Sequence, residues 1–281
     1  MKRVLTIQDI SCFGKCSITV ALPIISAMGV EVAILPTSVL STHTMFPGYR
    51  IKDLTEQLLA TIAHWKEHDI RFDAIYTGYL GTKEQVDIAL RVFDDFGKNA
   101  TIFVDPVMGD MGKLYPAFGP EYVNDNKRLC ARADVITPNI TEGALLTGME
   151  YKEEYGRSYV EEMLKKLSVM CKGRIMLTGV SLSGNKTGIL GLDVEKNRFF
   201  EYQNDLVSGR YHGTGDIFSS VTVGGLVNGM ELGRAAQLAA DYTAKTIKYT
   251  FDNPGSEWYG VDFEATIPLL IDELKAWRAH E

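Results

Sequence analysis

Several features that would place a chain in a common class are missing here. No run of about 18 uncharged apolar residues is present, so no segment has the length of a membrane-spanning helix. The 29 Lys and Arg residues are outnumbered by 36 Asp and Glu, which gives a net charge of −7 and no basic tract for a phosphodiester backbone. We therefore expect neither a membrane nor a nucleic acid as partner.

Cysteine is scarce, with four residues in a chain of 281, at positions 12, 16, 130 and 171. This number and the irregular spacing argue against a disulfide framework and suit a reducing compartment. Cys12 and Cys16 have no second Cys or His pair to complete a zinc site, so we expect them in a turn and the following helix. The first residues, MKRVLTI, lack the apolar core of a signal peptide, and we expect a cytoplasmic protein.

No linker rich in Pro or Ser, break in composition or internal repeat divides the chain, so we predict a single domain over residues 1–281. Short β-branched runs alternate with longer amphipathic stretches, which predicts an α/β fold with a mostly parallel sheet covered on both faces. The expected strands are residues 4–7, 32–36, 74–77, 101–104, 135–137 and 175–178. The expected helices are residues 18–28, 54–68, 86–96, 141–147, 159–170, a segment after residue 216, 232–250 and 263–280.

Two regions depart from this alternation. Between residues 187 and 202, two strand-like runs separated by Glu195, Lys196 and Asn197 predict a hairpin that forms the antiparallel part of the sheet. Between residues 105 and 134 we expect a loop rich in Gly and Pro. In such sheets ligands bind beyond the carboxyl ends of the strands, so function is expected in the loops that follow them.

The strongest functional signal is YHGTGDIFSS at residues 211–220. Gly213 and Gly215 allow a tight turn, and the amides opening the next helix can hold a phosphate. Asp216, beside that anion site, can take the proton from an alcohol that attacks the phosphate. The structural alternative is a glycine turn with Asp216 as a first-turn residue that complements the helix dipole.

Two further segments carry oxygen ligands at expected strand ends. DPVMGD places Asp105 directly after a strand, where the alternative is an ordinary Asp-Pro turn. TPNITE places Asn139 and Glu142 at the start of a helix, where they can form a capping box. Glu142 and Asp105 can also bind magnesium on nucleotide phosphates, often through water.

DPVMGD, TPNITE and GTGD occur in the order and at the intervals typical of the ribokinase-like superfamily of small-molecule kinases. The segments TIQDISCFGKCS, LSTHTMFPGY and TGYLG further resemble the pyridoxal/pyridoxine/pyridoxamine kinases of vitamin B6 salvage. The resemblance spans essentially the whole chain. It implies a three-layer αβα fold, and it implies a homodimer in which each protomer keeps its own active site.

The resemblance also implies roles for named residues. Asp216 would be the catalytic base for the 5′-hydroxyl, and the backbone of Gly213, Thr214 and Gly215 the anion hole for the γ-phosphate of ATP. The residues expected at Mg-ATP are Asp105, Asn139, Glu142 and Thr178, with Asp105 and Glu142 at the Mg²⁺, partly through water. The residues expected around the pyridine ring are Asp9, Thr44 and Tyr79. A monovalent cation remains open as a further requirement.

Departures from the family pattern keep alternatives open. Asp9 followed by Ile10 replaces the usual Ser-His, LSTHT replaces FSNHT, and FGKCS has one glycine fewer than its counterpart, which leaves the preferred vitamer open. The nearest alternative is a hydroxymethylpyrimidine kinase of thiamine synthesis, which an acidic residue in the first loop also resembles. A third reading is a vitamer-binding protein without activity, but Asp216 and both glycines are intact. A dehydrogenase is disfavoured, since no GxGxxG follows the first strand.

Overall fold

A single large sheet organises the protein. The structure is a computed structural model that describes residues 1–207, 209 and 211–280. Within these residues nine strands form the large sheet, in the order β11-β10-β9-β8-β5-β4-β1-β2-β3. The mostly parallel sheet with antiparallel edges confirms the predicted fold class.

The central strands are all parallel, whereas both edges are antiparallel. The parallel strands are β1 (Arg3–Ser11), β2 (Glu31–Leu40), β4 (Ala74–Thr77), β5 (Thr101–Val104), β8 (Val135–Ile136) and β9 (Arg174–Val180). At one edge β3 (Ile51–Asp53) pairs with β2. At the other edge β10 (Lys186–Asp193) and β11 (Arg198–Asp205) form the expected hairpin, confirming that prediction.

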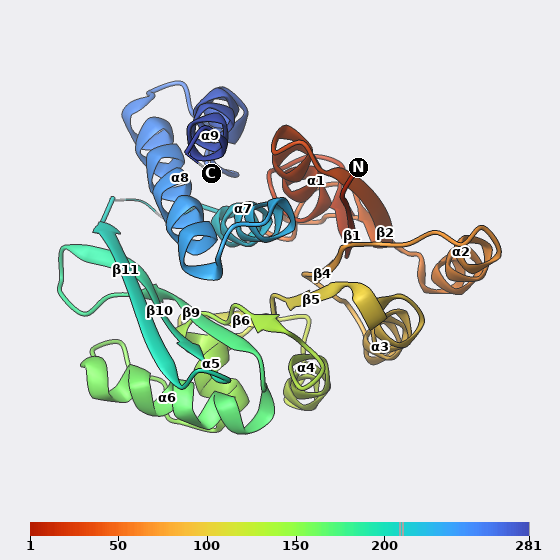
Figure 1. Ribbon diagram of the computed structural model, residues 1–281, viewed down its shortest axis with the longest axis horizontal. Helices are drawn as coiled ribbons and strands as arrows, with labels where there is room; N and C mark the ends of the chain where they lie inside the picture. Colours follow the sequence, from red (N-terminus) through yellow and green to blue (C-terminus); the bar gives the residue numbers. More distant parts are fainter. Residues whose placement is uncertain (208, 210, 281) are drawn as a thin grey trace.

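Helices cover both faces of the sheet (Figure 1). One face carries α1 (Ile18–Ala27), α7 (Thr214–Asn228), α8 (Leu232–Asp252) and α9 (Phe263–Arg278). The other carries α2 (Thr55–Glu67), α3 (Lys83–Phe96) with a short 3₁₀ turn (Gly97–Asn99), α4 (Tyr122–Cys130), α5 (Ile140–Thr147) and α6 (Arg157–Met170). In the described residues no helix is long and apolar enough to cross a bilayer.

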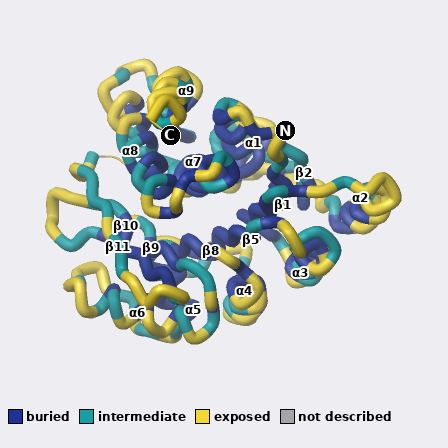
Figure 2. The backbone as a smooth tube through the Cα atoms, viewed as in Figure 1, coloured by how far each residue is buried: buried dark blue, intermediate teal, exposed yellow. Residues whose placement is uncertain are grey.

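Successive side chains along a strand point to opposite faces of the sheet, so the interior consists of two hydrophobic cores, one on each face. Leu5 of β1 and Ile75 of β4 point into the core shared with α2 to α6, whereas Val4 and Tyr76 point into the core shared with α1, α7, α8 and α9. Figure 2 shows the buried residues concentrated along the sheet and on the inward helix surfaces. Helix α7 is buried over most of its length, which fixes its position over the sheet.

The expected loop over residues 105–134 is wrong as a description of that whole segment. It contains β6 (Gly109–Asp110), β7 (Lys113–Leu114) and α4. The α4 sequence, YVNDNKRLC, has too few apolar residues for a clear helical period, because it buries Asp125 and Asn126 as well as Leu129. Cys12 and Cys16 are free thiols, and both precede α1 rather than entering it.

Candidate active site

The predicted site residues follow neighbouring parallel strands at one edge of the sheet. Tyr79 follows β4, Asp105 follows β5 and Asn139 follows β8. Backbone bonds tie these turns together, since the amide of Asp105 donates to the carbonyl of Thr77 at 2.9 Å. Asp9 lies within β1, where the pairing with β2 shifts register between Gln8 and Ile10. At the ends of these strands the Asp105 side chain reaches α7 through Ser219, whereas the Asn139 side chain donates to the carbonyl of Gly109.

The two glycines of GTGD have different surroundings. Gly213 is the N-cap of α7 with φ of 80°, and a Cβ there would lie 1.9 Å from the carbonyl oxygen of Lys15. A Cβ on Gly215 would meet no atom within 4 Å, so this residue faces open space. Among the described residues no side chain caps the first turn of α7. Its amides therefore remain available to an anion.

Asp216 lies in this first turn of α7. Asp216 is half-buried, and its Oδ2 accepts a hydrogen bond from the backbone amide of Ser17 at 2.9 Å. Burial raises the pKa of Asp216 to about 7, the Ser17 amide opposes that rise, and the charges of Asp105 and Asp9 add to it. A carboxyl group with this pKa can accept a proton near neutral pH.

Asp105 and Glu142 form a pair of buried carboxyl groups. Asp105 Oδ2 accepts from the hydroxyl of Ser219 at 2.8 Å, and burial raises the pKa of Asp105 to about 7. Glu142 accepts from the amides of Asn139, at 2.9 Å, and Met108, at 3.1 Å. Burial and then the nearby charge of Asp105 raise the pKa of Glu142. Two carboxyl groups that disfavour each other's ionisation would be stabilised by a cation.

The capping-box interpretation of TPNITE is confirmed. Asn139 Oδ1 accepts from the Glu142 amide at 2.9 Å, and its Nδ2 donates to the carbonyl of Gly109 at 2.9 Å. Asn139 also lies beside Thr178 of β9 through an isolated parallel bridge. The side chain of Asn139 thus builds the turn and the β6–β7 hairpin, while Thr178 is brought next to it.

The carboxylates present only part of a metal coordination shell. In the part of the chain that the structure describes, no group of three His, Cys, Asp or Glu side chains converges. Magnesium commonly takes one or two protein carboxylates and completes its shell with phosphate oxygens and water. Asp105 and Glu142 therefore fit Mg²⁺ that arrives with a nucleotide, and they do not fit an ion held by protein side chains alone.

The three expected ring-binding residues differ in placement. Asp9 is 4% exposed, and its Oδ2 accepts from the Ser11 hydroxyl at 3.2 Å. Burial raises the pKa of Tyr79 to about 12, and the charge of Asp9 adds to the rise. Thr44 is exposed in the loop between β2 and β3, and no contact found in residues 1–207, 209 and 211–280 joins it to Asp9 or Tyr79.

Two contributors were missed from the sequence. The Ser17 amide is a backbone group, and only the fold brings it to Asp216, so no sequence signal could have found it. Ser219 could have been found, because it follows Asp216 by three positions and therefore lies on the same face of α7.

The doubly covered sheet, the glycine turn opening α7 and the carboxyl groups at the strand ends define a ribokinase-like small-molecule kinase, a class of phosphotransferases. The family model for phosphomethylpyrimidine kinase matches residues 12–259. The chain belongs to this family.

Individual relatives agree with the family assignment. A Bacteroides thetaiotaomicron protein assigned to phosphomethylpyrimidine kinases, solved with pyridoxal, is 36% identical with a TM-score of 0.90, over 96% of this chain and 95% of that one. The pyridoxal kinase of Lactobacillus plantarum is 31% identical with a TM-score of 0.90, over 100% and 99% of the two chains. The pyridoxal kinase of Arabidopsis thaliana is 28% identical over 89% of this chain and 83% of its own length.

Proposed function

We propose that the protein transfers the γ-phosphate of ATP to the 5′-hydroxyl of pyridoxal, pyridoxine or pyridoxamine. The observation that carries the proposal is Asp216, a carboxyl group with a pKa of about 7 in the first turn of a helix opened by Gly213 and Gly215. The pyridoxal bound to the B. thetaiotaomicron relative supports a B6 vitamer as acceptor.

In the proposed reaction the 5′-oxygen attacks the γ-phosphorus while its proton passes to the Asp216 carboxylate. A bond forms between that oxygen and phosphorus, and the bond to the leaving oxygen of ADP breaks. The amides of Gly213, Thr214 and Gly215 stabilise charge on the transferring phosphoryl group. Phosphoryl transfer requires little covalent chemistry from the protein, so preorganised hydrogen-bond donors of this kind supply much of the catalysis.

Four residues form the proposed Mg-ATP side of the site. Asp105 and Glu142 would hold Mg²⁺, partly through water, and the ion would neutralise charge on the phosphate oxygens. Asn139 holds the β6–β7 hairpin beside them through the Gly109 carbonyl, and Thr178 would contact the nucleotide from the next strand end. Ser219 orients Asp105 through its 2.8 Å hydrogen bond.

The proposed vitamer side combines a buried carboxyl group with an aromatic ring. Tyr79 would pack against the pyridine ring, and Phe118 supports Tyr79 with ring centroids 5.4 Å apart. Asp9 would accept from the 3-hydroxyl or favour a protonated pyridine, and Thr44 would close over the substrate from the β2–β3 loop.

Phosphorylation of hydroxymethylpyrimidine is the second candidate function. Two findings favour it: the matching family model describes phosphomethylpyrimidine kinases, and the B. thetaiotaomicron relative is assigned to the same kinases. Asp216 would again be the base, and the amides of residues 213–215 would again form the anion hole. A vitamer-binding protein without activity is disfavoured by the intact Asp216, Gly213 and Gly215. We further propose one domain over residues 1–281, supported by the packing of α7 and α8 against the sheet and of α9 against α1 and α8. We also propose a cytoplasmic homodimer.

The direct test compares ADP release with Mg-ATP and four acceptors: pyridoxal, pyridoxine, pyridoxamine and 4-amino-5-hydroxymethyl-2-methylpyrimidine. A B6 vitamer with the highest kcat/KM supports the proposal. If the pyrimidine has the highest kcat/KM, the activity belongs to thiamine synthesis. If no acceptor leads to ADP release, both candidate functions are contradicted.

A further inference from the structure

Lys15 lies in the loop between β1 and α1 and reaches across to the start of α9. Its ammonium group donates to Asp262 and to Glu264, each at 2.9 Å, and lies 5.9 Å from the centre of the Phe263 ring. The Lys15 side chain is 18% exposed. Burial alone would lower the pKa of Lys15, but the two carboxylates outweigh it and raise that pKa. The ion pair is therefore a sheltered link between two distant segments.

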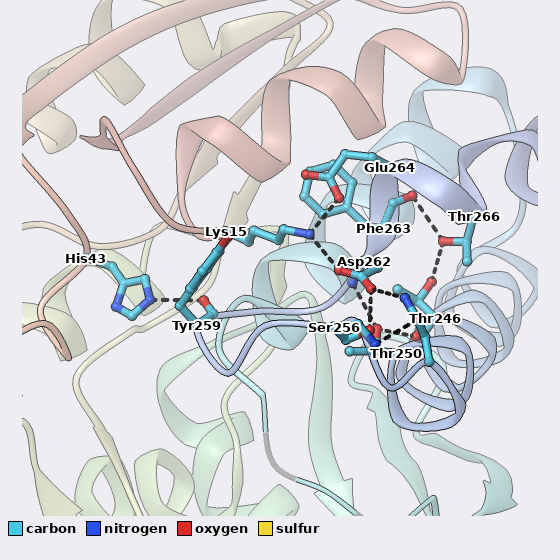
Figure 3. A network of polar contacts seen from close by, with 12 residues as sticks. Lys15, His43, Thr246, Thr250, Ser256, Tyr259, Asp262, Phe263, Glu264 and Thr266 are labelled. Carbon is cyan, nitrogen blue, oxygen red and sulfur yellow. Dashed lines mark hydrogen bonds and ion pairs between the residues drawn. The ribbon is translucent and has the colours of Figure 1, made fainter.

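Asp262 is itself held in place, as Figure 3 shows. Its Oδ2 accepts from the hydroxyl of Ser256 and from Asn253 Nδ2, while its backbone amide donates to Thr250 Oγ1 at 2.9 Å. The Thr250 hydroxyl donates in turn to the carbonyl of Thr246 on α8. Asp262 thus offers Lys15 a carboxylate whose position is fixed by α8 and by the segment joining α8 to α9.

The same short loop contacts the base and the phosphate turn. The carbonyl oxygen of Lys15 occupies the space in which a side chain on Gly213 would lie. Two residues later, the amide of Ser17 donates to Asp216 at 2.9 Å. Ser17 has φ of 52° and ψ of −133°, a positive-φ conformation that costs free energy for a residue other than glycine and persists only where the surroundings enforce it.

The segment joining α8 to α9 holds a second loop as well. The carbonyl of Tyr259 lies 2.9 Å from Nε2 of His43, and Nδ1 of His43 accepts from the amide of Met45. This pattern assigns the His43 proton to Nε2. The ring of Tyr259 also packs against Phe13, with centroids 4.9 Å apart. The segment therefore contacts both the loop of residues 12–17, at Phe13, and the loop between β2 and β3, at His43.

We propose that Lys15 is a positioning residue for phosphoryl transfer. Its ion pairs with Asp262 and Glu264 hold the loop of residues 12–17 so that the Ser17 amide stays directed at Asp216 and the Lys15 carbonyl stays against Gly213. This inference rests on the proposed function, in which Asp216 is the base. Because Lys15 acts through the loop rather than on the nucleotide, its loss should lower kcat more than it raises the KM for ATP.

The test compares Lys15→Met and Lys15→Arg with a matched control, Lys245→Met. Lys245 pairs with Glu273 at 2.9 Å between α8 and α9, away from the loop. We expect Lys15→Met to lower kcat about 10- to 100-fold, as small misplacements of catalytic groups do, with the KM for ATP within a few-fold of wild type. Lys15→Arg should restore most of kcat, because a guanidinium group can pair with both carboxylates, and Lys245→Met should match wild type.

Hydrogen exchange of the unliganded protein supplies a readout that does not depend on the substrate. Peptides covering residues 12–20 should exchange faster in Lys15→Met than in wild type or Lys245→Met. If Lys15→Met does not fold, Asp262→Asn removes one of the two carboxylates that pair with Lys15 while keeping an acceptor for Ser256. Because the pair with Glu264 remains, smaller changes in the same direction are expected of this variant.

Unchanged exchange in the loop would overturn the proposal, and so would faster exchange with an unchanged kcat. If wild type phosphorylates none of the four acceptors, the proposed function fails, while the exchange comparison still decides whether Lys15 holds the loop.

Discussion

The backbone amide of Ser17 donates a hydrogen bond to Asp216 at 2.9 Å, joining residues 199 positions apart in the chain. The contact favours the charged carboxylate, whereas burial favours the protonated form and raises the pKa of Asp216 to about 7. The balance keeps the proposed base close to the pH at which it must accept a proton.

The pH dependence of kcat/KM follows from this balance. Asp216 must be deprotonated to act as base, so kcat/KM should rise with pH and level off above about pH 7. Initial rates with limiting acceptor between about pH 5 and pH 9 measure it, corrected for the acceptor's own titration. A kcat/KM that stays flat across this range would contradict the assignment of Asp216.

Alanine substitutions at Gly213 and Gly215, the two glycines at the start of α7, should have different effects on stability. Gly213→Ala places a methyl group 1.9 Å from the Lys15 carbonyl at a positive φ, so we expect a loss of stability of roughly 1–3 kcal/mol together with lower activity. Unfolding in denaturant measures the loss. An unchanged unfolding midpoint would mean that this turn is not constrained as described.

Gly215→Ala is the matched comparison. Its methyl group meets no protein atom, and alanine favours a helix over glycine by about 0.5–1 kcal/mol, so stability should be kept or increased. The methyl group would instead enter the space proposed for the γ-phosphate, and turnover should fall by about tenfold or more, which corresponds to about 1.4 kcal/mol. Full activity in a stable Gly215→Ala variant would argue against phosphate binding there.

The buried carboxyl groups predict that the ligand-free protein is less stable at higher pH. The pKa of Asp105 is raised to about 7, so the folded state binds this proton more tightly than the unfolded state does. The stabilisation is present below about pH 4 and is lost as pH rises through about 7. Asp105→Asn should therefore raise the free energy of unfolding at about pH 8, by up to about 4 kcal/mol, and flatten its pH dependence. Lower stability of the variant at that pH would contradict the argument.

Magnesium dependence tests the role proposed for Asp105. Chelation of Mg²⁺ should abolish turnover, and Asp105→Asn should raise the half-saturating Mg²⁺ concentration by about tenfold or more, since metal sites lose affinity on this scale when their supporting groups change. Asp272→Asn, an exposed aspartate on α9, is the control. An unshifted Mg²⁺ titration in Asp105→Asn would remove that residue from the metal site.

Much of the fold could be predicted because its strands are short, β-branched and bounded by polar turns. Residues 74–77 and 101–104 match β4 and β5 at both ends for this reason. Helix α4 was not predicted because two of its buried residues, Asp125 and Asn126, are polar, and a search for a hydrophobic period does not count them. All three residues of strand β3 are exposed, and the strand is recognisable only by its pairing with β2.

The features of the candidate site also fall into two groups, those that the sequence could predict and those that it could not. The placement of Asp105 and Asn139 after strands, and of Asp216 in the first turn of a helix, could be predicted because strand ends and a glycine turn leave a local pattern. The contact between Ser17 and Asp216, and the ion pair between Lys15 and Asp262, connect segments about 200 or more positions apart. Such contacts depend on how α7 and α9 pack, and no local pattern encodes them.

The most direct test of the account follows label from γ-labelled ATP into pyridoxal, with wild type and Asp216→Ala side by side and ligand binding measured by calorimetry. We predict labelled pyridoxal 5′-phosphate with wild type, and formation at least about 10²-fold slower with Asp216→Ala while both ligands still bind, because a general base contributes on that scale. Turnover of Asp216→Ala within a few-fold of wild type, or no labelled product from wild type, would contradict the account.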